Sequence, residues 1–191
     1  MTGFTSYFTL GLQHISDLQA YDHIVFLVAL VAIYTFRDWK KVIWLVTAFT
    51  IGHSLTLALA AIGWIPVNVG LIEFLIPVTI LITGLYNIVK KDHANIRVKY
   101  LIALIFGLIH GMGFSNFFRS LLGTKTDITV PLLAFNLGVE AGQIVIVIIA
   151  LILSYLVVTK MQWINRRDWT VLLSGAAVGI SLILIQQTAF W

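Results

Sequence analysis

Residues 131–157 read PLLAFNLGVEAGQIVIVIIALILSYLV, and Glu140 is the only charged side chain in this stretch. A helix needs about 20 mainly apolar residues to cross a bilayer. Its backbone groups hydrogen-bond to one another, because lipid offers them no partners. The stretch therefore predicts a transmembrane helix. Working outward from it, apolar runs with few ionisable residues recur along the chain. They predict about six spans, a short one over 22–36 and longer ones over 41–62, 69–89, 98–118, 131–157 and 169–190.

The composition of the whole chain supports an all-α integral membrane protein. Hydrophobic residues make up 60% of the 191 positions, charged residues 10%, and the mean hydropathy is +0.99, whereas soluble domains carry about 25% charged residues. The mixed aromatic and polar residues 4–17 predict a short interfacial helix before the first span. We expect a single transmembrane helical domain over 1–191. The absence of cysteine excludes disulfides and thiolate metal ligands.

The basic residues predict the orientation of this bundle. Positively charged loops remain on the cytoplasmic side of a membrane, and most of the twelve Lys and Arg residues fall in alternate loops. We therefore expect a multi-pass protein of a bacterial inner-membrane type, with both termini outside and the lipid bilayer as a partner. The net charge of +4 then needs no nucleic acid to explain it. The basic residues on the expected inner side are Arg37, Lys40, Lys41, Lys90, Lys91, Arg97, Lys99, Lys160, Arg166 and Arg167, whereas Arg119 and Lys125 are on the other.

Four ionisable residues lie within the predicted spans. An ionisable group in hydrocarbon is costly, so each is a candidate functional residue. At a rise of about 1.5 Å per residue, His23, His53 and His110 lie about 18–20 Å above the inner face of the membrane core. Glu140 lies about 13 Å below the outer end of its span by the same rise. The four groups thus fall in one layer of the outer half, where they could meet.

Three imidazoles and a carboxylate are the ligand set of divalent transition metals such as nickel, zinc and cobalt. We therefore predict a metal site formed by His23, His53, His110 and Glu140. Asp22 directly precedes His23 and so cannot share its face of a helix, but it could orient another histidine. A hydrogen-bonded structural role for each histidine is the competing interpretation. The predicted supporting residues are His14, Asp17, Asp22, Glu73, Asn136 and Gln143.

Several motifs around these residues resemble the HupE/UreJ family of hydrogenase and urease accessory membrane proteins. They are Gly11 with His14, DHIVF at 22–26, VTAFTIGHSLTLA at 46–58, FGLIHGMGF at 106–114 and FNLGVEAGQ at 135–143, and Glu73 matches a glutamate early in the third span. The resemblance implies a nickel or cobalt permease, or a metal-handling protein that serves the accessory proteins of a metalloenzyme. In the segment before His23 the family commonly has Gly-x-Asp-His, where this chain has Ala20.

Two functions from different classes remain open on the sequence. A permease needs a polar route through both halves of the membrane, and the inner halves of the predicted spans are almost wholly apolar. The alternative is an intramembrane zinc hydrolase that acts on a lipid or membrane-anchored substrate from the outer side, with Glu140 or Asp22 as general base. A non-catalytic metal store is the third interpretation. A polar cavity that reaches the inner side would favour transport.

Overall fold

The computed structural model describes residues 3–89, 95–123 and 127–189, and within these ranges every regular element is helical. Five stretches are long and apolar enough to cross a membrane, and together they confirm the all-helical membrane class: Phe36–Ala61, Val69–Val89, Ile96–Gly113, Thr129–Lys160 and Arg166–Gln187. The helices are α1 (Phe4–Ser16), α2 (Asp22–Val31), η1 (Phe36–Asp38), α3 (Trp39–Ala61), α4 (Val69–Val89), α5 (Ile96–Gly113), α6 (Ser115–Leu122), α7 (Thr129–Ser154), η2 (Tyr155–Lys160) and α8 (Arg166–Gln187).

Two of the predicted spans differ from the helices observed. The short span expected over 22–36 is the ten-residue helix α2, which at 1.5 Å per residue covers about 15 Å and cannot cross a bilayer alone. The span expected over 98–118 is wrong at its end, because α5 stops at Gly113 and the short helix α6 turns away after Phe114. Helix α6 has one buried face and one exposed face, as on a surface helix. The hydropathy of residues 98–118 taken together does not distinguish α6 from α5.

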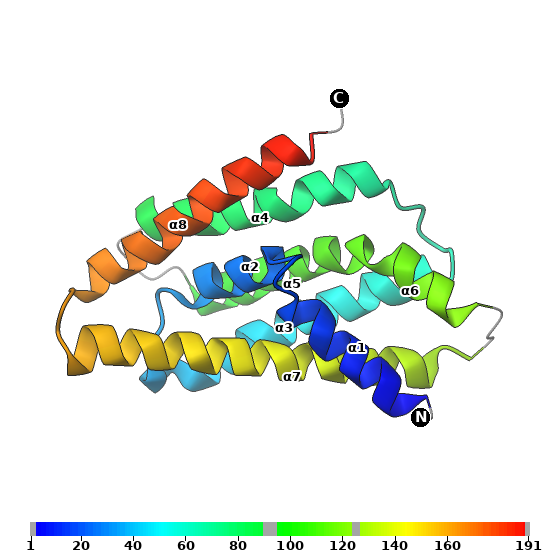
Figure 1. Ribbon diagram of the computed structural model, residues 1–191, viewed down its shortest axis with the longest axis horizontal. Helices are drawn as coiled ribbons and strands as arrows, with labels where there is room; N and C mark the ends of the chain where they lie inside the picture. Colours follow the sequence, from blue (N-terminus) through cyan, green and yellow to red (C-terminus); the bar gives the residue numbers. More distant parts are fainter. Residues whose placement is uncertain (1–2, 90–94, 124–126, 190–191) are drawn as a thin grey trace.

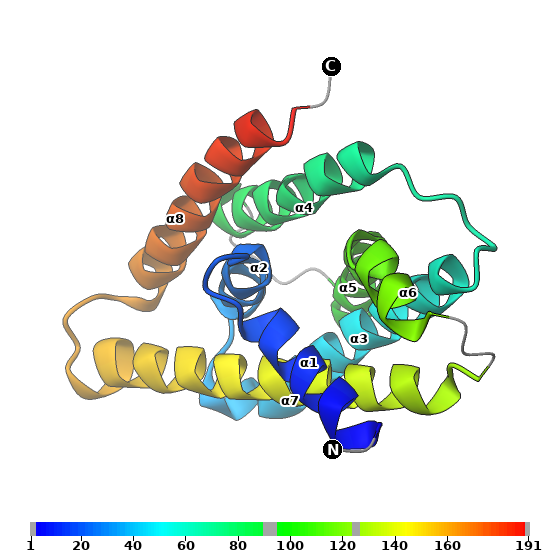
Figure 2. The ribbon, with the colours of Figure 1, turned by 45° about the vertical axis from the view of Figure 1, so that its right-hand side comes forward.

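The N-terminal helix α1 belongs to the bundle, which the prediction of an interfacial helix did not anticipate. Gly11 of α1 packs on the backbone of Phe135, and Gly138 of α7 packs on the backbone of Phe8. Gly142, further along α7, meets Ile15 near the end of α1, so the two helices run in the same direction and α1 lies along the first half of α7 (Figure 1). After a break at residues 17–21, α2 continues along the bundle (Figures 1 and 2). Together α1 and α2 follow the path of one interrupted crossing.

Glycines also set the distance between α3 and α5. A Cβ atom on Gly107 would overlap the carbonyl group of Phe49, and one on Gly111 would overlap that of His53. Small residues at such positions allow the backbones of membrane helices to approach closely. The glycines around His110 therefore bring its helix against the helix that carries His53.

The end of α2 is stabilised by side chains from α4 and α8. The last carbonyls of a helix lack partners within the helix, and within a bilayer no water replaces them. Asn87 donates to the carbonyl of Ala29 at 2.7 Å, and Thr170 donates to that of Ala32 at 3.1 Å. Arg166 donates to the carbonyl of Ile33. These bonds allow a short helix to end inside the bundle.

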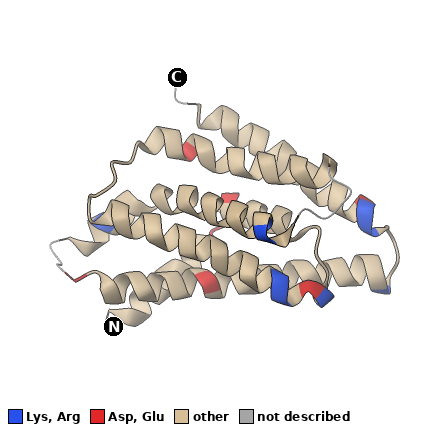
Figure 3. Cartoon of the chain, turned by 180° about the vertical axis from the view of Figure 1, so that it is seen from behind, with Lys and Arg blue, Asp and Glu red and all other residues tan. Residues whose placement is uncertain are grey.

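Apart from Arg119, the described basic residues lie at one end of the bundle, where α3, α5 and α8 begin and η2 ends (Figure 3). We call this end, marked by Arg37, Arg97, Lys160 and Arg166, the basic end. Arg119 on α6 lies at the opposite end, with the start of α1 (Figure 1). The one-sided pattern expected from the sequence is present among these residues, whereas Lys90, Lys91 and Lys125 lie outside the described residues.

Candidate metal centre

Three histidines meet where the interrupted crossing is broken. His14 lies in the last turn of α1, His23 in the first turn of α2, and His53 in α3. One nitrogen from each ring lies within 4.8 Å of the others. The ring centroids are 4.8 Å apart for His14 and His23, and 5.9 Å apart for His14 and His53. We refer to these residues as the three-histidine cluster.

The cluster contains buried polar atoms that lack partners. Nε2 of His14, Nε2 of His23 and both ring nitrogens of His53 are buried, and none has a hydrogen-bond partner among the described residues. His53 is 0% exposed and His23 4% exposed. Buried polar atoms in proteins are nearly always paired, and leaving one unpaired costs about 1–3 kcal/mol. The grouping of several such atoms makes the cluster a candidate binding site.

Asp22 holds His23 in place. Its Oδ1 atom accepts from the backbone N–H of His23 at 2.9 Å and lies 3.1 Å from Nδ1 of the same ring. The prediction that Asp22 would orient a different histidine is therefore wrong, because at the start of α2 the carboxylate folds back over the first turn. A carboxylate on one ring nitrogen fixes the tautomer and leaves the other nitrogen to bind a metal. Here the remaining nitrogen is Nε2, which is buried and has no hydrogen-bond partner among the described residues.

His110 lies beside the three-histidine cluster and forms a hydrogen bond with a residue of α4. Its ring centroid is 4.9 Å from that of His23. Its Nε2 atom, however, lies 2.9 Å from the hydroxyl of Thr79 on α4, and its buried Nδ1 atom has no partner in the described part of the chain. The structure thus brings His23, His53 and His110 into one region, with the ring of His110 turned towards α4.

Glu140 lies outside the three-histidine cluster. Thr47 donates a 2.7 Å hydrogen bond to its carboxylate, and Thr50 donates a 2.8 Å bond to the side-chain oxygen of Gln143. These two bonds join α7 to α3 in the turns that precede His53. Asn136, one turn before Glu140, lies next to His53. Coordination of a metal by Glu140 stays a prediction.

The remaining predicted residues lie towards the end of the bundle opposite the basic end. Glu73 is exposed and shares a pocket of about 170 Å³ with Asp22, Gln19 and Pro77. Asp17 is exposed in the break between α1 and α2, where it accepts from the backbone N–H of Gln19 at 2.8 Å. Asp22 therefore contacts His23 on one side and lines an open pocket on the other.

Phenylalanine rings surround the imidazoles. Phe114 lies 4.1 Å from the ring of His14, Phe135 lies 6.3 Å from that of His53, and Phe26 and Phe49 each lie 5.1 Å from that of His110, all between centroids. These apolar walls lower the local dielectric, which strengthens any charge interaction within them. We did not predict these residues, although each falls in a sequence motif that also carries a site residue.

The central place of His14 was also missed, since the sequence indicated only a supporting role. A signal for it exists, because Gly11 precedes His14 by three residues, as Gly107 precedes His110. In both cases the glycine packs on the backbone of a neighbouring helix and brings the histidine inward. The spacing of a glycine and a histidine thus marks two positions in this bundle where a histidine reaches the interior.

The arrangement fits a transition metal ion. Imidazole nitrogens bind zinc at about 2.0–2.1 Å in tetrahedral geometry, so two nitrogens on one ion are about 3.3–3.4 Å apart. The three nitrogens of the cluster lie within 4.8 Å of one another, so the rings would have to move together by up to about 1.4 Å to bind one ion. Three imidazoles suit zinc, nickel or cobalt, and coordination would satisfy one unpartnered nitrogen of each ring.

The fold and the cluster define a multi-pass helical membrane protein with a buried group of histidines able to hold a metal. The chain belongs to the HupE/UreJ family, because the family model described as HupE / UreJ protein matches residues 1–190. This family has a membrane accessory or nickel-transport role. No curated protein and no solved structure shows significant similarity to the chain.

Proposed function

We propose that the chain binds a divalent transition metal ion, of the nickel or cobalt type, at the three-histidine cluster and takes it up or hands it on. The observation that carries this proposal is the set of buried ring nitrogens without partners. His110 would stand beside the ion as a fourth imidazole after leaving Thr79. Glu140, whose Oε1 atom accepts from Thr47, lies outside this set of ligands.

The acidic pocket supports entry from the end opposite the basic end. Asp22 and Glu73 line this pocket, and a cleft lined by one sign of charge concentrates ions of the other sign. Asp22 also contacts His23, so an ion that reaches the pocket is next to the cluster. Since basic loops remain in the cytoplasm, we propose that the site faces the outer side of the cell membrane and that both termini lie outside.

The interrupted crossing supports a role in transport. Transporter sites typically lie where a membrane helix is broken, because the free backbone and side chains there can bind an ion within the bilayer. In this chain the break at residues 17–21 separates His14 from His23. A shift of α1 relative to α2 would then change the distance between two of the three imidazoles, which couples helix movement to the affinity for metal.

A zinc hydrolase remains the second candidate, and one observation favours it. The inner half below the cluster holds a pocket with almost wholly apolar walls, to which Lys99 adds a positive charge. Such a pocket is a poor route for a cation and suits a metal that stays in place. Zinc held by three imidazoles activates water at its open position. Asp22 or Glu140 would then act as general base on a lipid or a membrane-anchored substrate.

Uptake into proteoliposomes tests the proposal. Wild-type protein would be reconstituted around a metal-sensitive dye and supplied with nickel, cobalt or zinc, beside His53→Ala and the control Ser174→Ala. Ser174 is buried in α8 and has no hydrogen-bond partner in the described residues, so its truncation removes no contact of the site. We expect accumulation of nickel or cobalt with wild type and the control, and none with His53→Ala. Bound zinc without accumulation would overturn uptake and favour the hydrolase.

A further inference from the structure

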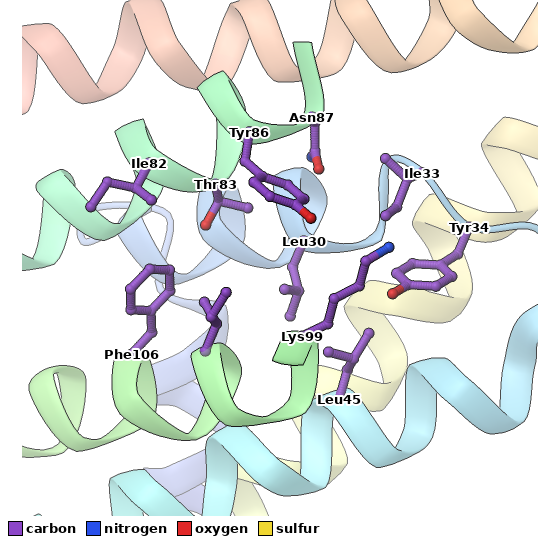
Figure 4. Close-up of a pocket in the computed structure, with 11 residues that line it drawn as sticks. Leu30, Ile33, Tyr34, Leu45, Ile82, Thr83, Tyr86, Asn87, Lys99 and Phe106 are labelled. Atoms are coloured by element: carbon purple, nitrogen blue, oxygen red, sulfur yellow. The ribbon is translucent and has the colours of Figure 1, made fainter. Parts of the chain in front are cut away.

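A cavity of about 530 Å³ lies at the basic end, apart from the three-histidine cluster. It is lined by the segment after α2, the start of α3, the end of α7 with η2, and Arg166 at the start of α8. Cavities of about 300–1,000 Å³ are typical of sites for small ligands. An apolar pocket that shares Ile33 with it (Figure 4) has a cavity volume of only about 60 Å³, which is room for a few water molecules. Of the two, only the larger cavity can hold an organic ligand.

Three basic residues and one acidic residue line this cavity. The basic residues are Arg37, Lys41 and Arg166, and the acidic residue is Asp38. Lys41 forms a 2.8 Å salt bridge with Asp38, whereas neither Arg37 nor Arg166 forms a salt bridge in the described part of the chain. Arg166 donates to the carbonyl of Ile33, but a guanidinium group carries five N–H donors. The cavity therefore has an excess of positive charge and of hydrogen-bond donors, which suits an anion.

The end of α7 and η2 form the opposite wall of the cavity. η2 is a stretch of π-helix, in which the N–H of Met161 donates to the carbonyl of Leu156, five residues earlier, at 2.8 Å. Single turns of π-helix are rare and frequently occur at functional sites. From this wall Ser154 and Thr159 contribute hydroxyl groups and Val158 an apolar side chain. A ligand with both a polar anionic part and an apolar part fits such a lining.

Exposed aromatic residues indicate that the cavity lies at the membrane surface. Trp39 begins α3, Tyr155 begins η2, and Trp163 lies between η2 and α8, and all three are exposed. Trp and Tyr are enriched where a bilayer meets water. Tyr155 itself lines the cavity and lies 6.3 Å, between ring centroids, from Phe36, another lining residue. The cavity is therefore at the depth where lipid head groups lie.

We propose that this cavity binds the phosphate group of an anionic phospholipid from the leaflet at the basic end. Arg37 and Arg166 would bind the phosphate oxygens, because charge-assisted hydrogen bonds from arginine to phosphate are strong and often bidentate. Basic pockets between membrane helices on the cytoplasmic side bind such head groups. A metal cation would instead meet an excess of positive charge. The bound lipid would join the segment after α2 to α7 and α8, and the proposal does not depend on metal binding.

Lipid titration of the purified full-length protein tests this site. Native mass spectrometry would count bound phosphatidylglycerol or phosphatidylcholine on the wild type, on Arg37→Gln and on the control Arg97→Gln. Arg37 and Arg97 are both exposed at the basic end, but only Arg37 lines the cavity. A basic residue near the membrane surface contributes about 1 kcal/mol to anionic lipid binding, which corresponds to about a fivefold change in affinity. We expect Arg37→Gln to lose about this factor for phosphatidylglycerol, and Arg97→Gln to retain wild-type affinity.

Two further measurements separate a lipid in the cavity from other sources of binding. Ser154→Leu places a larger side chain in the cavity and should reduce the binding of phosphatidylglycerol while leaving the charges unchanged. Glycerol phosphate at equal concentration should displace little of the lipid, because it has no acyl chains to be removed from water.

Equal binding of the two lipids by the wild type would overturn the proposal, as would unchanged binding in Ser154→Leu. An equal loss in Arg37→Gln and Arg97→Gln would also overturn it, because it would indicate attraction to the whole basic end. Displacement of the lipid by an equal concentration of glycerol phosphate would show that the cavity takes a free phosphate compound and would overturn the lipid as its ligand.

Discussion

Replacing Gly111 by alanine tests whether the close contact of α3 and α5 positions the histidines. A Cβ atom on Gly111 would overlap the carbonyl oxygen of His53, whereas an ordinary Cβ contact lies at 3.4–4 Å. The two helices must therefore separate. Overpacking of this kind costs about 1–3 kcal/mol, and the gain from replacing a helical glycine is about 0.5–1 kcal/mol. The net loss of up to about 2.5 kcal/mol corresponds to a fall in Tm of up to about 10 °C for a chain of this length.

Gly175→Ala is the matched control for this change. It also lies in a helix, but a Cβ atom there meets no atom within 4 Å. Its Tm should remain the same or rise by about 1–4 °C, from helix propensity alone. Metal affinity should fall at least tenfold in Gly111→Ala only, since a site must be held to about 0.5 Å. Thermal unfolding and metal titration in mild detergent give both quantities. Equal behaviour of the two variants would refute the role of the α3–α5 contact.

Three further changes test other parts of the structure. Asn87→Leu should lower the free energy of unfolding by about 1–3 kcal/mol, because the carbonyl of Ala29 loses its donor inside the bundle; an unchanged Tm would contradict this. Asp22→Asn should weaken metal binding about 10- to 100-fold in a calorimetric titration, because the amide no longer fixes His23 as the carboxylate does; equal affinity would contradict it. Glu73→Gln should slow metal association in stopped-flow experiments and reduce its dependence on salt, and a faster dissociation instead would contradict an entry role.

Hydropathy predicted where residues lie along the bundle. The apolar stretches 41–62 and 69–89 correspond closely to α3 and α4, because the length of an apolar run sets where a spanning helix begins and ends. The same reasoning placed His23 and His53 at one depth, and the structure brings a nitrogen of each within 4.8 Å. The basic residues likewise indicated which loops share an end of the bundle.

The rotation of each helix and the path of α1 could not be predicted in this way. Depth gives no direction around a helix axis, so the sequence could not show that Glu140 would face Thr47 while His110 would turn to Thr79. Those directions depend on the contacts between helices, which glycines and backbone carbonyls set. The mixed composition of residues 4–17 also concealed the fact that Gly11 places α1 against α7 and brings His14 inward.

The metal content of the purified protein tests most directly whether His14, His23 and His53 form a metal site. Elemental mass spectrometry would be applied to the wild type, to His53→Ala and to the buried control Ser174→Ala, each prepared in mild detergent and loaded with nickel, cobalt or zinc. We predict one ion for each chain of the wild type and the control, and none for His53→Ala. Folded wild-type protein that holds no metal and cannot be loaded with one would contradict the site, and the histidines would then form a hydrogen-bonded cluster.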